Sequence, residues 1–394
     1  MGEGNASGKG KRRAAAVLAG LLVLVLPACS RGGIEEPSPA EVALGQRLND
    51  YHEQLKRDGF QGVVEIRRDG ERLLSEAYGM ADTAASRRNA VDTPFRVGAL
   101  TEQVTALAVL ALQADRRLQV ADPVCRYLPG CPPAWQAITV KDLLLHTSGL
   151  PDYLALGAEE QAELDARRLS HLAFVGHLQG KPVERPPGRW QRSGTDYVVL
   201  GALIEYLTSK PYGEHVTATI LRGLGMNDTA ADWERTNPAT RATGHVGDRA
   251  ADPVPLTRYA DRALVTTAAD LGRWNAFLLT GLPPGAPVEA RVRLVDEHSG
   301  PATGEGDTRQ GHGALFRGLA GWAEVHAMGA VAGFEAFSGV RTKAGVSVVV
   351  LTNATSPTNA TSPTAQASPS SAAGSYGTKA AEMGVRLLAI ASPS

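Results

Sequence analysis

Segments with strand-like alternation lie near both ends of this chain, and segments with helical spacing fill the middle. Residues 60–78 alternate around the turn sequence RDGE at 68–71, which predicts a β-hairpin. Three more strands are predicted late in the chain, over 318–325, 334–341 and 346–352. Helices are predicted between them, over 101–113, 141–146, 160–178, 197–207, 213–221 and 268–279. This order predicts an α/β fold class, in which both chain ends build one sheet and an all-helical part is inserted.

The chain divides into a main domain and shorter flanking segments. The main domain is predicted over 41–352, with its sheet part at about 41–98 and 300–352 and its helical part at about 122–290. Residues 353–374 repeat NATSPT and consist mainly of Pro, Ser, Thr and Ala, so we expect a disordered loop. Residues 375–394 are expected to form a final helix and a tail.

The first residues are similar to an export signal. Basic residues at 9–13 precede an apolar run over 14–26, which is short of the ~20 residues needed to cross a bilayer as a helix. The run ends in LPAC, which resembles a bacterial lipoprotein signal in which Cys29 is lipidated. We therefore expect a signal peptide at 1–28, a tether at 29–40 and a protein anchored by lipid in the cell envelope, at the outer membrane if the cell has one. The alternative is an ordinary secretory signal in which the cysteine falls by chance.

The net charge and the cysteine spacing argue against nucleic-acid and metal partners. The chain has 40 basic and 41 acidic residues, so it lacks the basic excess that binds nucleic acid. Cys125 and Cys131 are poorly spaced for zinc and no HExxH occurs, so we expect neither a metal nor a cofactor. Because an exported protein folds in an oxidising compartment, these two cysteines are expected to form a local disulfide.

Longer motifs between residues 93 and 337 carry a family resemblance. They include TPFRVGALTEQVTALAVLALQ, LQVADPVCRYLP and ITVKDLLLHTSGLPDY between 93 and 153, PPGRW at 186–190, TTAADLGRW at 266–274 and GAVAGFEAF at 329–337. The chain resembles the serine β-lactamase and penicillin-binding-protein-like hydrolases, in particular the class C-related branch that includes esterases and D-amino-acid peptidases. The resemblance implies a β-lactamase/transpeptidase-like fold, with the active site in a cleft between the sheet part and the helical part.

The residues that perform this family's chemistry are replaced here. The resemblance implies a Ser-x-x-Lys motif at the start of the buried helix, but this chain has Ala99 and Glu102. It implies a Tyr-x-Asn motif on a loop, but here Arg192 and Gly194 flank Ser193. Loss of a nucleophile and its base lowers turnover about a million-fold. We therefore expect the chain to be catalytically silent by the acyl-serine route.

The third family motif, His or Lys-x-Gly on a strand, is also degenerate. It aligns with Ala327-Met328-Gly329, and His326 lies one residue out of register. A one-residue bulge would bring His326 into the site. Arg262-Ala263 stand where the family usually has two glycines.

Glu102 and Arg192 occupy positions whose family side chains face each other. We expect a salt bridge between them, because a lone charge in a partly buried cleft is costly; the alternative is that both side chains are solvated. Glu102, Arg192, Ser193 and His326 are the expected contacts of a ligand in the cleft. Ser193 has no obvious base and Thr101 lies on the far side of its helix, so neither is expected to be a nucleophile.

Two functional classes follow. The first is a non-catalytic lipoprotein that binds a cell-wall peptide or an envelope protein, with Arg192 holding a carboxylate. The second is a hydrolase in which Glu102 activates a water molecule and Arg192 stabilises the oxyanion. A purely structural spacer tethered to the membrane is a third hypothesis.

Overall fold

The computed structural model describes residues 37–231, 236–251, 259–281, 289–291, 294, 300–304, 306–319, 322–355 and 378–392. The predicted signal peptide, Cys29 and most of the tether lie outside these residues, as does most of the predicted loop over 353–374. Residues 43–394 form one unit, and the description below concerns that unit.

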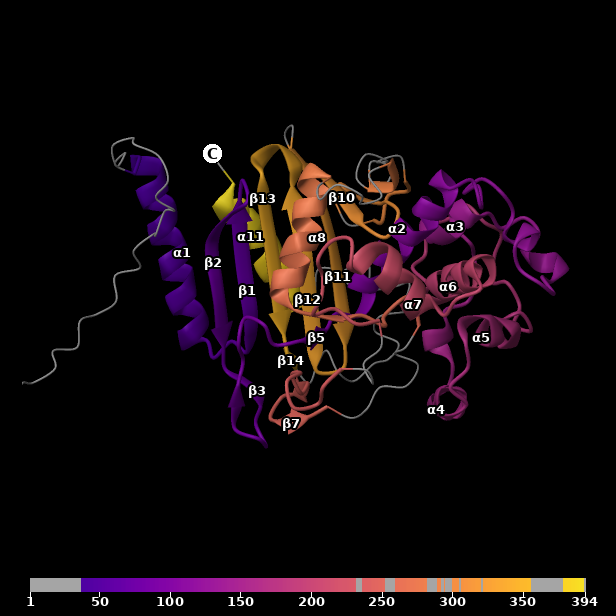
Figure 1. The fold of residues 1–394 in the computed structure, drawn as a ribbon, viewed down its shortest axis with the longest axis horizontal. Helices are drawn as coiled ribbons and strands as arrows, with labels where there is room; N and C mark the ends of the chain where they lie inside the picture. Colours follow the sequence, from indigo (N-terminus) through magenta and orange to yellow (C-terminus); the bar gives the residue numbers. More distant parts are fainter. Residues whose placement is uncertain are drawn as a thin grey trace, which may run out of the picture. The chain divides into compact units, whose positions relative to one another are not determined.

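Strands from both ends of the chain form one antiparallel sheet, as predicted from the sequence (Figure 1). The strand order is β2-β1-β13-β12-β11-β10-β9. β1 pairs with β13 along its whole length, so a strand from near the C-terminus lies beside the N-terminal hairpin. The strands are β1 (Gly62–Arg68), β2 (Glu71–Tyr78), β9 (Thr308–Gln310), β10 (Leu315–Leu319), β11 (Trp322–Val331), β12 (Phe334–Arg341) and β13 (Val346–Thr352).

The predicted strand over 318–325 has wrong boundaries. Leu319 pairs with Trp322 in an antiparallel register, so the segment contains the end of β10 and the beginning of β11. Apolar residues continue through the chain reversal, and for this reason the sequence pattern is typical of a single strand.

The predicted loop over 353–374 begins too early. Asn353 is fully buried, and its amide donates hydrogen bonds to the carbonyls of Met80 and Thr243. The next two residues form β14, which pairs in parallel with β6. The short strands of the structure are β3 (Met80–Asp82), β4 (Arg87–Arg88), β5 (Phe95–Arg96), β6 (His245–Val246), β7 (Arg249–Ala250), β8 (Val265–Thr266) and β14 (Ala354–Thr355).

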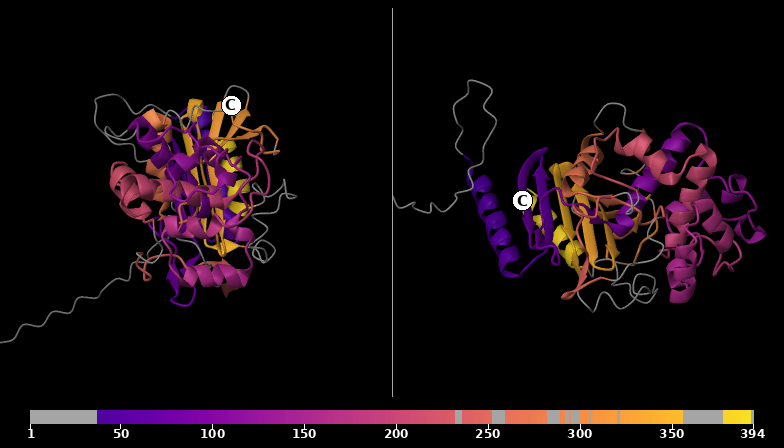
Figure 2. Two further views of the ribbon diagram at one scale, coloured as in Figure 1. Left: turned by 90° about the vertical axis from the view of Figure 1, so that its right-hand side faces the viewer. Right: turned by 60° about the horizontal axis from the view of Figure 1, so that its bottom comes forward.

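Helices cover both faces of the large sheet (Figure 1, Figure 2). Both faces need a cover because β13 has apolar side chains on each of them, since successive side chains of a strand point to opposite faces. Val348 and Val350 pack with α1 and α11, whereas Val349 and Leu351 join the core that contains α8. The three helices are α1 (Pro39–Arg57), α8 (Ala268–Thr280) and α11 (Lys379–Ala391).

The helical part is built around α2 and α6, which are buried over most of their length. Both are apolar on nearly all sides, which is typical of helices in a protein interior. The predicted helix over 160–178 is broken in two, because Arg168 has a φ of 49° and Ser170 caps α5 by accepting from the Ala173 amide at 3.2 Å. The helices are α2 (Thr101–Ala114), α3 (Val140–Leu144), α4 (Ala158–Ala166), α5 (His171–Leu178), α6 (Gly194–Thr208) and α7 (Tyr212–Val216).

Cys125 and Cys131 form the predicted disulfide. In the ranges that the structure describes, no helix has the length and apolar character needed to span a membrane. Within the same ranges, no three His, Cys, Asp or Glu side chains are grouped so that they could hold a metal ion.

Candidate active site

Ala99 lies in a tight turn directly before α2 and packs against β11. Gly98 has a φ of +52°, and a Cβ there would lie 3.0 Å from the backbone of Ala330. A Cβ at Gly329 would lie 2.7 Å from the Ala99 nitrogen. The first and third motif segments are therefore in contact, and Ala99 remains partly exposed beside them.

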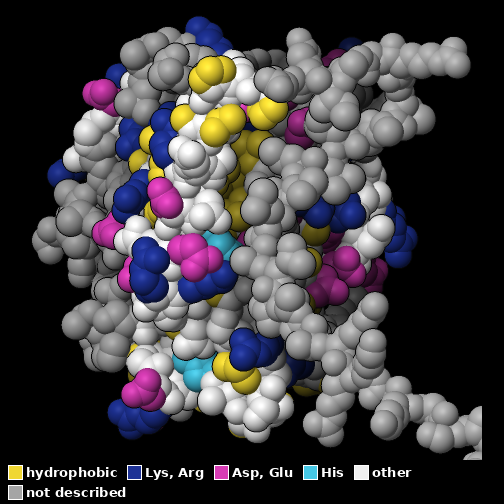
Figure 3. Space-filling model, turned by 90° about the vertical axis from the view of Figure 1, so that its left-hand side faces the viewer, with side chains coloured by type: hydrophobic (Ala, Val, Ile, Leu, Met, Phe, Trp, Pro, Cys, Tyr) yellow, Lys and Arg dark blue, Asp and Glu magenta, His cyan; other side chains and the backbone are white. Residues whose placement is uncertain are grey.

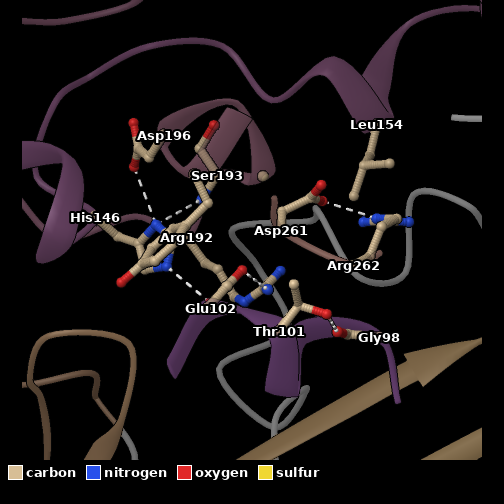
Figure 4. Close-up of polar contacts among 12 residues, drawn as sticks. Gly98, Thr101, Glu102, His146, Leu154, Arg192, Ser193, Asp196, Asp261 and Arg262 are labelled. Carbon is tan, nitrogen blue, oxygen red and sulfur yellow. Dashed lines mark hydrogen bonds and ion pairs between the residues drawn. The ribbon is translucent and has the colours of Figure 1, made fainter. Parts of the chain in front are cut away.

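Glu102 and Arg192 form the predicted ion pair (Figure 4). Glu102 projects from the first turn of α2, and Arg192 lies two residues before α6. Nη2 of Arg192 donates to Oε1 of Glu102 at 2.5 Å. The Glu102 side chain is 7% exposed and the Arg192 side chain is 28% exposed, so the pair joins a buried carboxylate to a cation that reaches solvent. The charges of Glu102 and Arg192 thus neutralise each other.

His146, which the motifs did not indicate as a site residue, lies on the other side of the Glu102 carboxylate. Its Nε2 is 3.4 Å from Glu102 Oε2, and its Nδ1 is 3.0 Å from Asp196 Oδ2. Ser148 donates a hydrogen bond to the other Asp196 oxygen. Burial alone would lower the pKa of His146, but the hydrogen bonds to Asp196 and Glu102 raise it to about 9. This raised pKa favours the imidazolium form of His146 at neutral pH, in which the ring lies between the carboxylates of Asp196 and Glu102.

The same contacts set the pKa values of two carboxyl groups. Burial alone would raise the pKa of Glu102, but the charges of Arg192 and His146 hold it below its ordinary value. Burial raises the pKa of Asp196 to about 6, although the hydrogen bond from His146 opposes this rise. Glu102 is therefore ionised at neutral pH, with each oxygen next to a cation.

Gly194 has neighbours that occupy the space that a side chain at this position would need. A Cβ on Gly194 would lie 2.9 Å from Asp261 Oδ2 and 2.9 Å from Tyr153 Cε1. Asp261 Oδ2 accepts hydrogen bonds from Tyr153 Oη and from Arg262 Nε, each at 2.8 Å. Asp152 accepts from the Gly194 amide at 3.1 Å. The Asp261 carboxylate, held by Arg262, therefore fills the space that a side chain at position 194 would need.

His326 does not lie in this site, and the prediction that it contacts a ligand there is wrong. β11 pairs with β12 in an unbroken register over residues 324–331, so this stretch contains no bulge that would turn His326 toward Ala99. In a regular strand, His326 and Ala327 point to opposite faces. Ala327 joins the core that contains α2, whereas His326 is fully buried and stacks on Phe337 in the core on the α11 side. Burial lowers the pKa of His326 to about 3, so its ring is neutral.

The hydroxyl groups of Thr101 and Ser193 lie near the motif positions, but neither has the orientation and the neighbouring base that a nucleophile needs. Thr101 Oγ1 donates to the Gly98 carbonyl at 2.7 Å and accepts from the Leu264 amide at 3.1 Å, so it faces away from the site as predicted. Ser193 is 1% exposed, and among the described residues its Oγ has no hydrogen-bond partner. The Ser193 amide, not its hydroxyl, faces His146 Nδ1 at 3.4 Å, which leaves the hydroxyl without a base.

Comparison with known proteins leads to the family that the motifs indicate. The sequence model of the family described as Beta-lactamase matches residues 48–368. Esterase EstB of Burkholderia gladioli is 32% identical over 200 residues, which are 47% of this chain and 51% of the esterase. Protein flp of Staphylococcus aureus (strain NCTC 8325 / PS 47) is 23% identical over 301 residues, which are 73% of this chain and 58% of that protein. The chain thus spans about half the length of these curated relatives.

A solved structure shows the same fold. The penicillin binding protein from Bacillus halodurans aligns with a TM-score of 0.67 and 22% sequence identity, over 77% of this chain and 94% of that chain. The family match includes both ends of the large sheet and all three motif segments. The chain therefore belongs to the beta-lactamase family.

Proposed function

We propose that this protein is a non-catalytic member of the beta-lactamase family that acts as a binding or scaffold protein of the bacterial cell envelope. The observation that carries the proposal is the ion pair of Glu102 with Arg192, backed by His146. Acyl-serine chemistry needs a hydroxyl nucleophile and a group that accepts its proton. At these positions the chain has a methyl group, at Ala99, and a carboxylate held by two cations.

The geometry also disfavours the alternative hydrolase, in which Glu102 activates water. A general base must take up a proton during the reaction. Oε1 of Glu102 accepts from Arg192 and Oε2 lies beside His146, so protonation would remove the negative charge that both groups contact. The lowered pKa of Glu102 reflects this cost.

Attachment to the membrane through a lipid on Cys29 remains part of the proposal, with the protein exposed on the extracytoplasmic side. The disulfide between Cys125 and Cys131 supports an oxidising compartment. On the face that Figure 3 shows, basic and acidic side chains are interspersed, which fits a partner other than a polyanion. The partners we propose are a cell-wall peptide or an envelope protein.

Intact-mass spectrometry tests catalytic silence. The purified protein is incubated with a β-lactam or a fluorophosphonate, with EstB as the positive control for the fluorophosphonate. We expect no added mass on this chain, and a covalent adduct on any serine or threonine would overturn the proposal. Ester hydrolysis that is lost in Glu102→Gln would instead establish the water route.

A second experiment tests the anchor. Cells that express the full chain are labelled with a radioactive fatty acid. We expect label on the wild-type protein and none on Cys29→Ser, whereas equal label on both would refute lipidation at Cys29.

A further inference from the structure

We propose that the Arg192 guanidinium binds a singly charged carboxylate group of a ligand. When no ligand is bound, the Glu102 carboxylate pairs with this guanidinium instead. This inference rests on the proposed binding function and names the chemistry of the ligand. It assigns Glu102 a regulatory role, because the ligand must compete with an internal carboxylate.

The exposure of Arg192 distinguishes it from the other arginine of the site. Its side chain is 28% exposed, whereas that of Arg262 is 7% exposed and bonded to Asp261. A guanidinium has five N–H donors in a planar fork. Among the described residues, Glu102 is the group that accepts from Arg192, through one nitrogen and one oxygen. The remaining donors suit a second carboxylate arriving from the solvent side.

His146 makes the exchange of carboxylates feasible. A buried carboxylate that loses its only cation costs several kcal/mol. Glu102 does not face that loss, because its second oxygen is 3.4 Å from His146 Nε2. When a ligand takes the guanidinium, Glu102 remains paired with the imidazolium, and Asp196 holds the other side of the ring.

Two further carboxylates limit the charge of the ligand. Burial and the charge of Arg262 would lower the pKa of Arg192, but the carboxylates of Glu102, Asp152 and Asp261 outweigh them and raise it. The carboxylates of Asp152 and Asp261 lie 3.3 and 2.9 Å from a Cβ built on Gly194, two residues after Arg192. Together with Glu102 they outnumber the guanidinium groups of Arg192 and Arg262, and this excess of negative charge disfavours a dianion such as sulfate. A single carboxylate, as at the end of a peptide, adds one negative charge and matches the planar fork.

Isothermal titration with sodium acetate and with sodium sulfate, at pH 7 and equal ionic strength, tests the proposal. We expect saturable binding of acetate and weaker binding of sulfate. Glu102→Gln removes the competing charge and is expected to tighten acetate binding at least about tenfold. Arg192→Gln is expected to abolish it. The exposed Arg222 serves as the matched control, and Arg222→Gln should bind like the wild type.

Several outcomes would overturn the inference. They are unchanged or weaker acetate binding by Glu102→Gln, retained binding by Arg192→Gln, or sulfate binding as tight as that of acetate. If Arg192→Gln does not fold, the double variant Glu102→Gln/Arg192→Gln replaces it, because it leaves no carboxylate without its cation. A covalent adduct in the mass spectrum would refute catalytic silence whatever the titration shows, whereas absent acetate binding would refute only the ligand class.

Discussion

The ion pair of Glu102 with Arg192 predicts an asymmetric loss of stability when either partner is neutralised. Removing one partner of a buried ion pair costs about 3–5 kcal/mol. Arg192→Gln leaves Glu102 buried, but His146 still lies 3.4 Å from it, so we expect a loss of about 2 kcal/mol. Glu102→Gln leaves a cation that is 28% exposed and can be hydrated, so we expect about 1 kcal/mol.

A double-mutant cycle measured by equilibrium urea unfolding at pH 7 checks these values. Glu102→Gln/Arg192→Gln should cost less than the sum of the single changes, with a coupling of about 1–2 kcal/mol. The exposed pair of Glu53 with Lys56 is the control, because side chains that are 46% and 52% exposed are screened by solvent and should show a clearly smaller coupling. A coupling no larger than in this control, or a greater loss from Glu102→Gln than from Arg192→Gln, would refute the reasoning.

Three other predictions follow from the site and the disulfide. Gly194→Asn, which restores the family residue, should destabilise the fold by about 1–3 kcal/mol because its Cβ would lie 2.9 Å from Asp261 Oδ2; Asp261→Gly should relieve part of this loss in a thermal melt. The raised pKa of His146 makes its stabilising contribution complete below pH 6.5 and lost as the pH rises through about 9. Urea unfolding between pH 6 and 10 should show this decline, and it should be smaller in His146→Gln. Replacing Cys125 and Cys131 by serine should cost about 2 kcal/mol in urea unfolding, since their separation of 6 residues closes only a short loop.

The sequence predicted the sheet because segments near both chain ends alternate apolar and polar residues. Strands with this pattern bury their apolar face when they pair in one sheet. The sequence also predicted the pairing of Glu102 with Arg192, because the resemblance implies that these two positions face each other and here they carry side chains of opposite charge. Strand alternation already placed His326 and Ala327 on opposite faces, and only an assumed bulge brought the histidine into the site.

The roles of His146 and Asp261 could not be predicted in the same way. His146 belongs to the HTSGLP segment, but its partner Asp196 lies 50 residues away, and a local pattern does not show which distant side chains meet. The Asp261 carboxylate matters because it fills the space beside Gly194, a relation that only packing reveals.

The pairing of β1 with β13 affects the order in which the protein can fold. The hydroxyl of Thr352 donates to the carbonyl of Gln61, 291 residues away in the sequence. β1 and β2 come early in the chain, so the free edge of β1 stays unpaired until β13, near the other end, is available to pair with it. Such long-range closure slows folding and prolongs the exposure of an edge that can aggregate. Truncation before β13 should therefore yield a product that chaperones and proteases recognise as unfinished.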